Sequence, residues 1–257
     1  MNLLVLLRMV ADVVEELEIA PDGKSLERDL LRMIPSEWDE FALEQALLLK
    51  ERHGGKVTVA ALEAPEVDDA LYTALARGAD RAVKIAGLEP GTSTSVAAEL
   101  LGRLLADGRG LMPADLILVG TQAIDDLDGL LAPILAARLD LPYVGIVTRV
   151  AVEDGRARVT REYPRNVRGE FEVSLPAILG VQSAEKPPRY VPLSKVRAAM
   201  KSQQIEIVEA PEVEPATAVA LAELVKPVAA GQAKMLEGGP EEVAREIVAL
   251  LSERGLV

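Results

Sequence analysis

The sequence predicts an α/β fold in which a parallel sheet carries helices on both faces, followed by late antiparallel strands and an extended C-terminal arm. Three observations predict it. Short apolar runs alternate with helical patterns as far as residue 139, which is typical of strand–helix units. Beyond Pro142, β-like segments flank a glycine-centred turn. Beyond Ser183, recurring prolines interrupt the pattern until a last helix, so the expected fold is Rossmann-like with an added arm.

Hydrophobic periodicity defines the elements of the first half. Apolar or alternating runs indicate strands, and apolar residues near a 3.6-residue period indicate helices. The first helix is expected near Phe41 and ends at Gly54 and Gly55, which places His53 at a helix C-terminus. The expected strands cover residues 3–7, 56–62, 81–85 and 114–119, and three further helices cover residues 67–77, 95–105 and 130–139.

The second half is less regular. Gly155 supplies the positive φ that a hairpin turn needs between two β-like segments. The last helix begins at Pro240, which suits a first helical position, and Glu241 and Glu242 suit the positive end of its dipole. The β-like segments are residues 144–150, 156–162 and 170–175, strands are expected at residues 176–181 and 205–208, and the last helix covers residues 240–252.

Two parts are expected along the chain, an α/β domain over residues 1–184 and an arm over residues 185–257. A connection of about 40 residues without a regular pattern is hard to accommodate inside a compact domain. The arm therefore packs back on its own domain or reaches onto a partner. The apolar stripe of its last helix favours docking, because it otherwise stays in water.

Composition excludes several classes of function. The net charge of -13 argues against nucleic acid and against an anionic membrane surface, since both need a basic face. The absence of cysteine excludes disulfides, thiolate metal sites, iron–sulfur ligation and a cysteine nucleophile. No stretch is long and apolar enough to insert in a membrane, and Met1 leads directly into a strand pattern, so we expect a cytoplasmic protein.

Residues 120–126 are the most informative stretch, because they follow a buried strand and precede a helix. Gly120 allows a tight turn, and the first N–H groups of a helix have no partner within it, so the geometry favours an anion or a nucleotide. Asp125, Asp126 and Asp128 have a second interpretation, in which they cap the helix and match its dipole. The sequence leaves both interpretations open.

Other motifs point to weaker alternatives. Neither a GxGxxG fingerprint nor a GxxxxGK[ST] loop occurs, which counts against dinucleotide binding and P-loop hydrolysis. A stand-alone nucleotide-binding module would rest on the Gly120 loop alone. A hydrolytic enzyme would use Asp125 or Asp126 with a metal, but one histidine and no obvious nucleophile disfavour it. Arg161 and Glu162 are interpreted as a surface ion pair across the sheet or an interface pair.

Residues 188–197 combine a proline-flanked apolar tip with positive charge. Leu193 is the tip, and Lys195, Arg197 and Lys201 follow it in an otherwise acidic chain. An apolar anchor with a charged rim is how small protein interfaces combine affinity with orientation. The alternative is an ordinary helix start, and the pattern alone does not exclude it.

Four stretches together resemble the beta subunits of electron transfer flavoproteins. Residues 40–51 resemble the family's first long helix, and residues 73–81 its helix-to-strand turn. Residues 120–126 resemble its nucleotide loop. The family's late β region and recognition loop are similar to residues 160–162, 175–177 and 188–190 of this chain. The order and spacing of the four are similar to those of the family, and the resemblance covers nearly the whole chain to Lys201.

The resemblance implies a heterodimer with an alpha subunit that holds most of one FAD. The pair would take electrons from flavin dehydrogenases, such as the acyl-CoA dehydrogenases of fatty acid oxidation, and pass them to a membrane quinone oxidoreductase. The beta subunit would be an electron-carrier subunit that performs no bond chemistry itself. Its residues 1–184 would form an AMP-type nucleotide-binding domain, and its terminal helix would pack on the alpha subunit.

The resemblance also assigns residues. The partner-binding residues would be Arg189, Tyr190, Leu193, Lys195 and Arg197, with Glu162 steering the flavin-bearing domain. The residues that would bind a structural AMP are Leu6, Leu62, Gly120, Thr121, Gln122, Ala123, Ile124, Asp125, Asp126, Gly129, Leu130 and Leu131.

This chain departs from the family at one part of the nucleotide loop. The family usually continues with amide and hydroxyl side chains that bond the phosphate, whereas this chain has Gly129, Leu130 and Leu131, which cannot. AMP would then rely on backbone N–H groups, or bind weakly, or be absent. Electron-bifurcating relatives hold a second FAD in the same place and favour a Gly-Asp-Thr run, which is also missing.

Overall fold

A computed structural model describes residues 1–27, 31–87, 92–107, 110–126, 129–213, 221–227, 233 and 235–257. The chain divides into two compact units, Met1–Glu223 and Leu224–Val257, which are considered separately. Asp128, one of the three acidic residues interpreted as a helix cap, lies outside the described residues.

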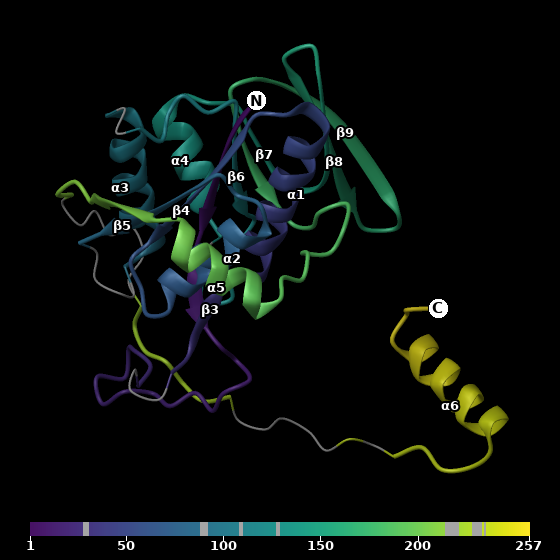
Figure 1. Cartoon of the computed structure of the whole chain (residues 1–257). Helices are drawn as coiled ribbons and strands as arrows, with labels where there is room; N and C mark the ends of the chain where they lie inside the picture. The colour runs from purple at the N-terminus through teal and green to yellow at the C-terminus, as the bar shows by residue number, and fades with distance from the viewer. Residues whose placement is uncertain are drawn as a thin grey trace. The chain divides into compact units, whose positions relative to one another are not determined.

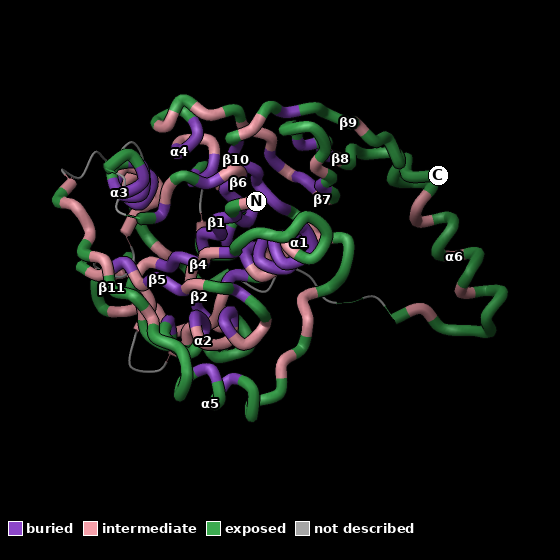
Figure 2. Tube along the Cα trace, turned by 45° about the horizontal axis from the view of Figure 1, so that its top comes forward, coloured by how far each residue is buried: buried purple, intermediate pink, exposed green. Residues whose placement is uncertain are grey.

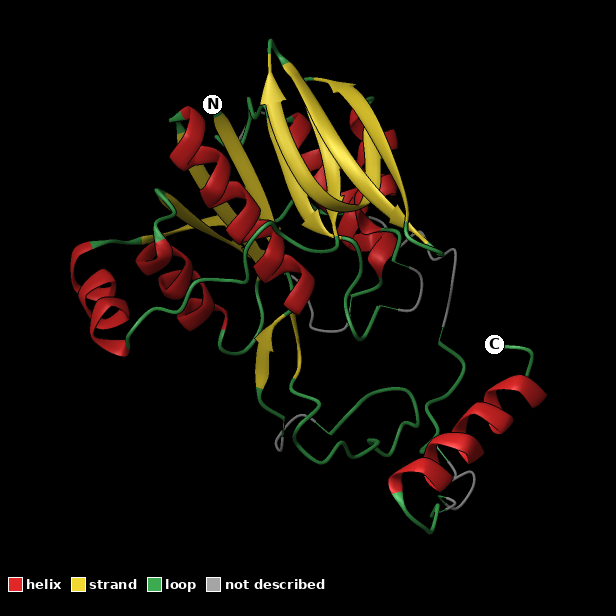
Figure 3. Cartoon of the chain, turned by 90° about the vertical axis from the view of Figure 1, so that its right-hand side faces the viewer, coloured by secondary structure: helices red, strands yellow, loops and turns green. Residues whose placement is uncertain are grey.

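Nine strands of the described chain form one sheet in the first unit, in the order β11-β5-β4-β1-β6-β10-β7-β8-β9. Neighbours from β11 to β7 run parallel, and β7, β8 and β9 run antiparallel as a long meander (Figure 3). The predicted fold class is therefore confirmed. The strands are β1 (Asn2–Leu7), β4 (Lys56–Leu62), β5 (Arg81–Ala86), β6 (Leu116–Gly120), β7 (Tyr143–Glu153), β8 (Arg156–Tyr163), β9 (Val167–Ser174), β10 (Ala177–Val181) and β11 (Ile205–Glu209).

Helices cover both faces of the parallel part of the sheet (Figure 1). On one face lie α1 (Glu37–His53) and α2 (Val67–Arg77), with α5 (Leu193–Ser202) packed on α2. On the other face lie α3 (Thr94–Ala106) and α4 (Leu131–Leu139). His53 is the last residue of α1, as predicted, and Gly54 follows at a positive φ.

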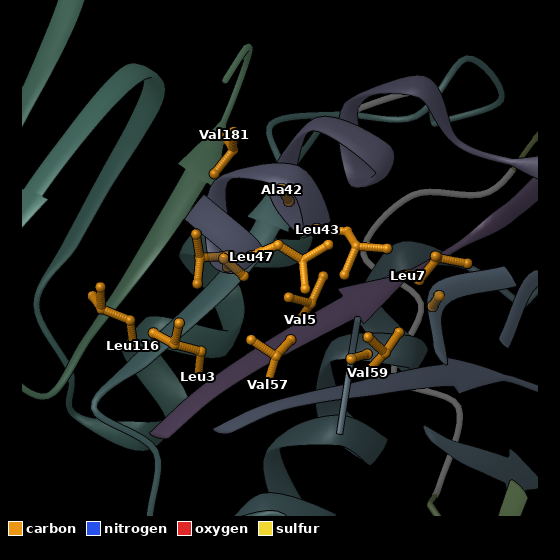
Figure 4. Close-up of a cluster of buried hydrophobic side chains, with 14 of the residues drawn as sticks. Leu3, Val5, Leu7, Ala42, Leu43, Leu47, Val57, Val59, Leu116 and Val181 are labelled. Atoms are coloured by element: carbon orange, nitrogen blue, oxygen red, sulfur yellow. The ribbon is translucent and has the colours of Figure 1, made fainter. Parts of the chain in front are cut away.

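The hydrophobic core forms because successive side chains of a strand point to opposite faces of the sheet. In β1, Leu3, Val5 and Leu7 pack under α1, whereas Leu4 and Leu6 pack under α3 and α4. Figure 4 shows the first of these layers, in which the side chains of β1 and β4 meet those of α1. The tube in Figure 2 shows the same burial pattern, with α5 exposed along most of its length. Only Val196 and Ala199 of α5 are buried.

The predicted helices and strands of the first half are confirmed to within a few residues, with one larger difference. The helix expected near Phe41 begins at Glu37, where Ser36 is the N-cap and Glu37, Asp39 and Glu40 occupy the first turn. The apolar periodicity does not reach this turn because Asp39 is a buried charge. A charge in the first turn of a helix suits its dipole, which explains the earlier start.

Residues 185–213 are more regular than the sequence predicts. The predicted strand at 205–208 is confirmed as β11, which extends the sheet beside β5. Helix α5 begins at Leu193, so residues 188–197 do contain a helix start, but the N-cap Pro192 makes no side-chain capping hydrogen bond, and the docking interpretation stays a prediction. Helix α5 lies outside the main layer, and its two buried residues are enough to fasten it to α2.

Strands β2 (Met9–Ala11) and β3 (Met33–Pro35) form a separate two-stranded antiparallel sheet. In the chain, β2 follows β1 and β3 precedes α1. In the second unit, the predicted last helix is confirmed as α6 (Pro240–Glu253). Pro240 is at its first position, and the Glu242 side chain accepts a hydrogen bond from the backbone N–H of Gly239. None of the described helices combines the length and the apolar character that crossing a bilayer requires.

The sheet edge at β11 is held by an ion pair that makes a pH prediction possible. Arg81 donates Nε–H and Nη2–H bonds to the two carboxylate oxygens of Glu206, at 2.7 and 2.5 Å. These bonds lower the pKa of the Glu206 carboxyl below its ordinary value. The stabilisation is therefore present above the unfolded-state pKa of about 4.3 and is lost as pH falls through the lower folded-state value.

We expect Glu206→Gln to lower the free energy of unfolding at pH 7 by about 0.2–1 kcal/mol, the range for an exposed pair. Urea unfolding of both proteins between pH 7 and pH 3 measures this. The difference should shrink towards acid, and a difference independent of pH contradicts an ion-pair origin.

Candidate functional site

The carboxyl ends of β1 and β6 meet the start of α1 through a buried ion pair. Arg8 follows β1 and donates its Nε–H to Asp39 Oδ2 at 3.0 Å and its Nη2–H to Oδ1 at 3.2 Å. The Arg8 backbone N–H also donates to Asp39 Oδ2, at 2.9 Å. Asp39 is fully buried. Burial alone would lower the pKa of Arg8, but the Asp39 and Asp126 carboxylates more than offset it and raise that pKa.

Asp39 reaches β6 as well. Its Oδ1 accepts a hydrogen bond from the Gly120 N–H at 2.6 Å. A Cβ on Gly120 would lie 2.5 Å from Asp39 Oδ1, 2.7 Å from the Asp39 nitrogen and 2.7 Å from the Trp38 carbonyl carbon. Because two of these atoms are backbone, they cannot move aside cheaply. A glycine at the end of β6 is therefore required for α1 to approach so closely.

The loop after β6 is tied to the same guanidinium. Arg8 Nη1–H donates to Asp126 Oδ2 at 2.9 Å, and Arg8 Nη2–H donates to the carbonyl oxygens of Gly120 and Gln122. Asp126 Oδ1 accepts from the Thr94 hydroxyl at 2.9 Å and from the Gly129 N–H at 3.1 Å. The loop is thus held to β1 and to α3 by side chains of this chain.

The helix-cap interpretation of Asp125 and Asp126 is wrong for the described residues. The N-cap of α4 is Leu130, whose own side chain makes no capping hydrogen bond. Asp126 instead accepts hydrogen bonds from the Arg8 guanidinium and the Thr94 hydroxyl. Asp125 is exposed. The physical reason is that a nearby guanidinium binds a carboxylate more strongly than a helix N-terminus does.

The AMP phosphate implied by the resemblance can be tested against this donor set. After Leu130, the first turn of α4 is Leu131, Ala132 and Pro133, so it is apolar, and Pro133 has no backbone N–H. The Arg8 guanidinium is already shared by Asp39 and Asp126. A phosphate in the described part of the loop would meet more negative than positive charge. The described side chains therefore do not favour a phosphate, and AMP binding through backbone N–H groups stays a prediction.

The structure brings most predicted nucleotide residues to one edge of the sheet. Leu6 lies near the end of β1 beside Val119 of β6, and Leu62 ends the neighbouring β4 and packs against the same core layer. Leu6 and Leu131 are buried. Around the loop, Gly120 and Ala123 are buried, Thr121 and Gly129 are half-buried, and Gln122, Ile124 and Leu130 are exposed.

Glu162 lies on a cavity of about 380 Å³ between the start of α1 and the end of β8. The expected pair between Arg161 and Glu162 is not formed. Adjacent residues of a strand point to opposite faces, so Glu162 pairs with Arg168 directly across on β9, at 3.3 Å, and Arg161 lies over the Tyr163 ring. The cavity is lined by Glu37, Trp38, Phe41, Thr148, Glu162, Tyr163, Pro164, Gln182 and Ser183.

The residues predicted to bind a partner divide into two groups. Tyr190 is 87% exposed, Leu193 at the first position of α5 is 61% exposed, and Lys195 and Arg197 are also exposed. Arg189 is different, because its guanidinium pairs with Glu44 and Glu51 of α1. Its partner is therefore within the chain.

Arg8, Asp39 and Thr94 are site residues that the sequence reasoning missed. Two signals were present. Arg8 is a charge placed directly after a continuous apolar strand, and Asp39 precedes the amphipathic pattern of α1. Thr94 gave no signal, since a threonine at a helix start is common.

Comparisons with known proteins identify the family of this chain. A family model described as the electron transfer flavoprotein domain matches residues 25–215. The electron transfer flavoprotein subunit beta of Bacillus subtilis is 31% identical over 264 residues and covers all of both chains. The subunit of the same name from Methylophilus methylotrophus is 27% identical over 98% of both chains, and that from Homo sapiens 28% identical over 81% of both.

The structure is an α/β fold with a mostly parallel sheet and a glycine-containing loop at its carboxyl edge. The sequence matches the relatives along its whole length, and together these features point to one class of protein. The chain belongs to the electron transfer flavoprotein family, as a beta subunit. Such a subunit implies an alpha subunit as its partner and association with a flavin, and it is typically a non-catalytic electron-carrier subunit.

The buried pair makes a stability prediction. We expect Asp39→Ala to lower the free energy of unfolding by about 3 kcal/mol or more, because it leaves the Arg8 charge buried without its main partner. Urea unfolding measures it. The control is Asp68→Ala, which removes a mostly exposed carboxylate paired with Lys84 and should cost at most about 1 kcal/mol. Equal losses would contradict a special role for Asp39.

Proposed function

We propose that this beta subunit works in a heterodimer that takes electrons from flavin dehydrogenases, such as acyl-CoA dehydrogenases, and delivers them to a membrane quinone oxidoreductase. The FAD is held mainly by the alpha subunit. This chain supplies a rigid platform and a docking surface, and we expect the complex in the cytoplasm. The role is supported by the match to beta subunits along the whole chain.

The observation that carries the docking role is the exposure of Leu193. A leucine at the first position of α5, beside exposed Lys195 and Arg197, offers an apolar anchor with a positive rim. The rest of the chain is acidic, so these charges orient a partner of opposite sign. Tyr190 extends the same tip, and Glu162 is assigned to steering the flavin-bearing domain.

The described residues give little support to chemistry by this chain alone. They include no group of three or more His, Asp or Glu side chains arranged to hold a metal ion. Asp126, a candidate for metal-dependent hydrolysis, is already paired with Arg8. A stand-alone nucleotide-binding module would need a phosphate cradle, and the donors of the loop disfavour one.

Co-expression with the cognate alpha subunit tests the proposed function. We expect a stable yellow complex, and alpha expressed alone should lose flavin. Acid extraction and mass analysis of the complex should give FAD but no stoichiometric AMP. The heterodimer proposal fails if no complex forms, or if the alpha subunit retains flavin equally well without this chain. Stoichiometric AMP would overturn the reading of the loop, and a second FAD would favour the bifurcating relatives.

Leu193→Ala tests the docking surface. We expect a loss of about 2 kcal/mol or more, typical of a truncated anchor, seen as at least a tenfold rise in the concentration of complex needed for half-maximal reduction by an acyl-CoA dehydrogenase. FAD content should not change. The matched control is Ile207→Ala, because Ile207 is equally exposed but lies on β11, the edge strand of the sheet, and not on α5. Unchanged kinetics of Leu193→Ala would remove the anchor role.

A further inference from the structure

The segment that leads into α5 has no secondary structure, yet one of its residues is held by five hydrogen bonds. Arg189 donates Nε–H to both Glu44 oxygens at 2.9 and 3.1 Å, and Nη2–H to Glu44 Oε1 at 2.8 Å. Its Nη1–H donates to Glu51 Oε1 at 2.6 Å. Its backbone N–H donates to Glu44 Oε2 at 3.0 Å. Side chain and main chain are thus fixed together.

The burial of Glu44 makes this contact strong. The Glu44 side chain is 3% exposed, and that of Arg189 is 30% exposed. A buried carboxylate without its partner is costly, so Glu44 keeps Arg189 in place. Hydrogen bonds and charge from Glu44 and Glu51 hold the pKa of Arg189 above its ordinary value. Two carboxylates of α1 therefore clamp one arginine of the segment.

A second contact fixes the segment four residues earlier. Arg52 of α1 donates Nη1–H and Nη2–H to the two oxygens of Glu185, at 2.7 and 2.6 Å. Pro187 and Pro188 lie between the two contacts and restrict the chain further. On the other side of the tip, Val196 and Ala199 bury α5 against α2. The exposed Tyr190 and Leu193 therefore stand between two fixed points.

We propose that Arg189 is a positioning residue, which clamps the segment to α1 so that Leu193 is presented to a partner already in its docked arrangement. This role rests on the proposed function, since it needs Leu193 to be the anchor. Ordering a loop and its side chains on binding costs free energy, and a tip that is ordered beforehand avoids that cost. Prior ordering matters most for an anchor of one leucine, because such an anchor has few other contacts to offset the free-energy cost of ordering the segment.

The clamp predicts kinetics that direct contact does not. In the alpha–beta complex, we expect Arg189→Ala to raise the half-saturating concentration for reduction by an acyl-CoA dehydrogenase about three- to tenfold, with the maximal rate within about twofold. Arg189→Lys should be intermediate, since an ammonium cannot bind Glu44 in the same bidentate way. In the double variant with Leu193→Ala, removing Arg189 should add at most about twofold, because the anchor it positions is gone.

Hydrogen exchange in the same complex gives a readout that needs no dehydrogenase. In Arg189→Ala, amides of residues 185–191 should exchange faster, whereas those of α2 should not change. Leu193→Ala should leave this exchange as it was. The matched control is Arg77→Ala, which removes another arginine bound to a glutamate of α1, Glu40 at 2.7 Å. It should leave both the half-saturating concentration and the exchange of residues 185–191 unchanged.

The outcomes separate the two proposals. If Leu193→Ala has no effect, the docking role fails, whatever Arg189→Ala does. If Leu193→Ala weakens docking but Arg189→Ala leaves the segment protected and the kinetics unchanged, the clamp is overturned. If the two losses add fully in the double variant, Arg189 acts independently of the anchor, and the positioning role is also overturned. Faster exchange with a non-additive loss supports it.

Discussion

The buried pair of Arg8 and Asp39 is the contact on which the carboxyl edge of the sheet depends. One carboxylate receives the guanidinium and backbone N–H of Arg8, and the N–H of Gly120. It therefore fixes β1, α1 and β6 relative to one another. Since a buried charge without its partner costs several kcal/mol, α1 cannot slide along the sheet. The same guanidinium then holds the loop through Asp126.

Helix α1 links this edge to the proposed docking tip. Its first turn carries Asp39, and its later turns carry Glu44, Glu51 and Arg52, which hold the segment before α5. One helix therefore holds two regions of the fold whose residues are far apart in the sequence. The buried Glu44 and Asp39 interrupt its apolar face, so part of its hydrophobic packing is exchanged for ion pairs that specify where the two segments lie.

Periodicity predicted most of the fold because each strand and helix buries a face that its own residues define. Residues 56–62 and 67–77 were predicted with their observed bounds for this reason. The ion pairs were not predictable in the same way. Arg8 pairs with Asp126 and Glu44 with Arg189 across more than a hundred positions, and many acidic residues compete for each arginine in one sequence. Helix α5 was not predicted in full, because the recurring prolines beyond Ser183 interrupt the pattern and only two residues of the helix are buried. The Gly120 loop and the basic tip at Leu193 were predicted from the residue pattern, the remaining nucleotide and docking residues came from the resemblance, and the roles of all of them stay predictions.

An electron carrier must bind each partner specifically and then release it. A large apolar interface would give affinity at the cost of slow dissociation, since affinity differences lie mostly in the dissociation rate. A single leucine with basic neighbours suits the opposite requirement, because the charges speed the encounter and the small anchor limits the lifetime. Such a small contact is useful only if its geometry does not have to form on each encounter. The clamp of the segment to α1 meets this need, and it links the stability of the fold to the turnover of a shuttle.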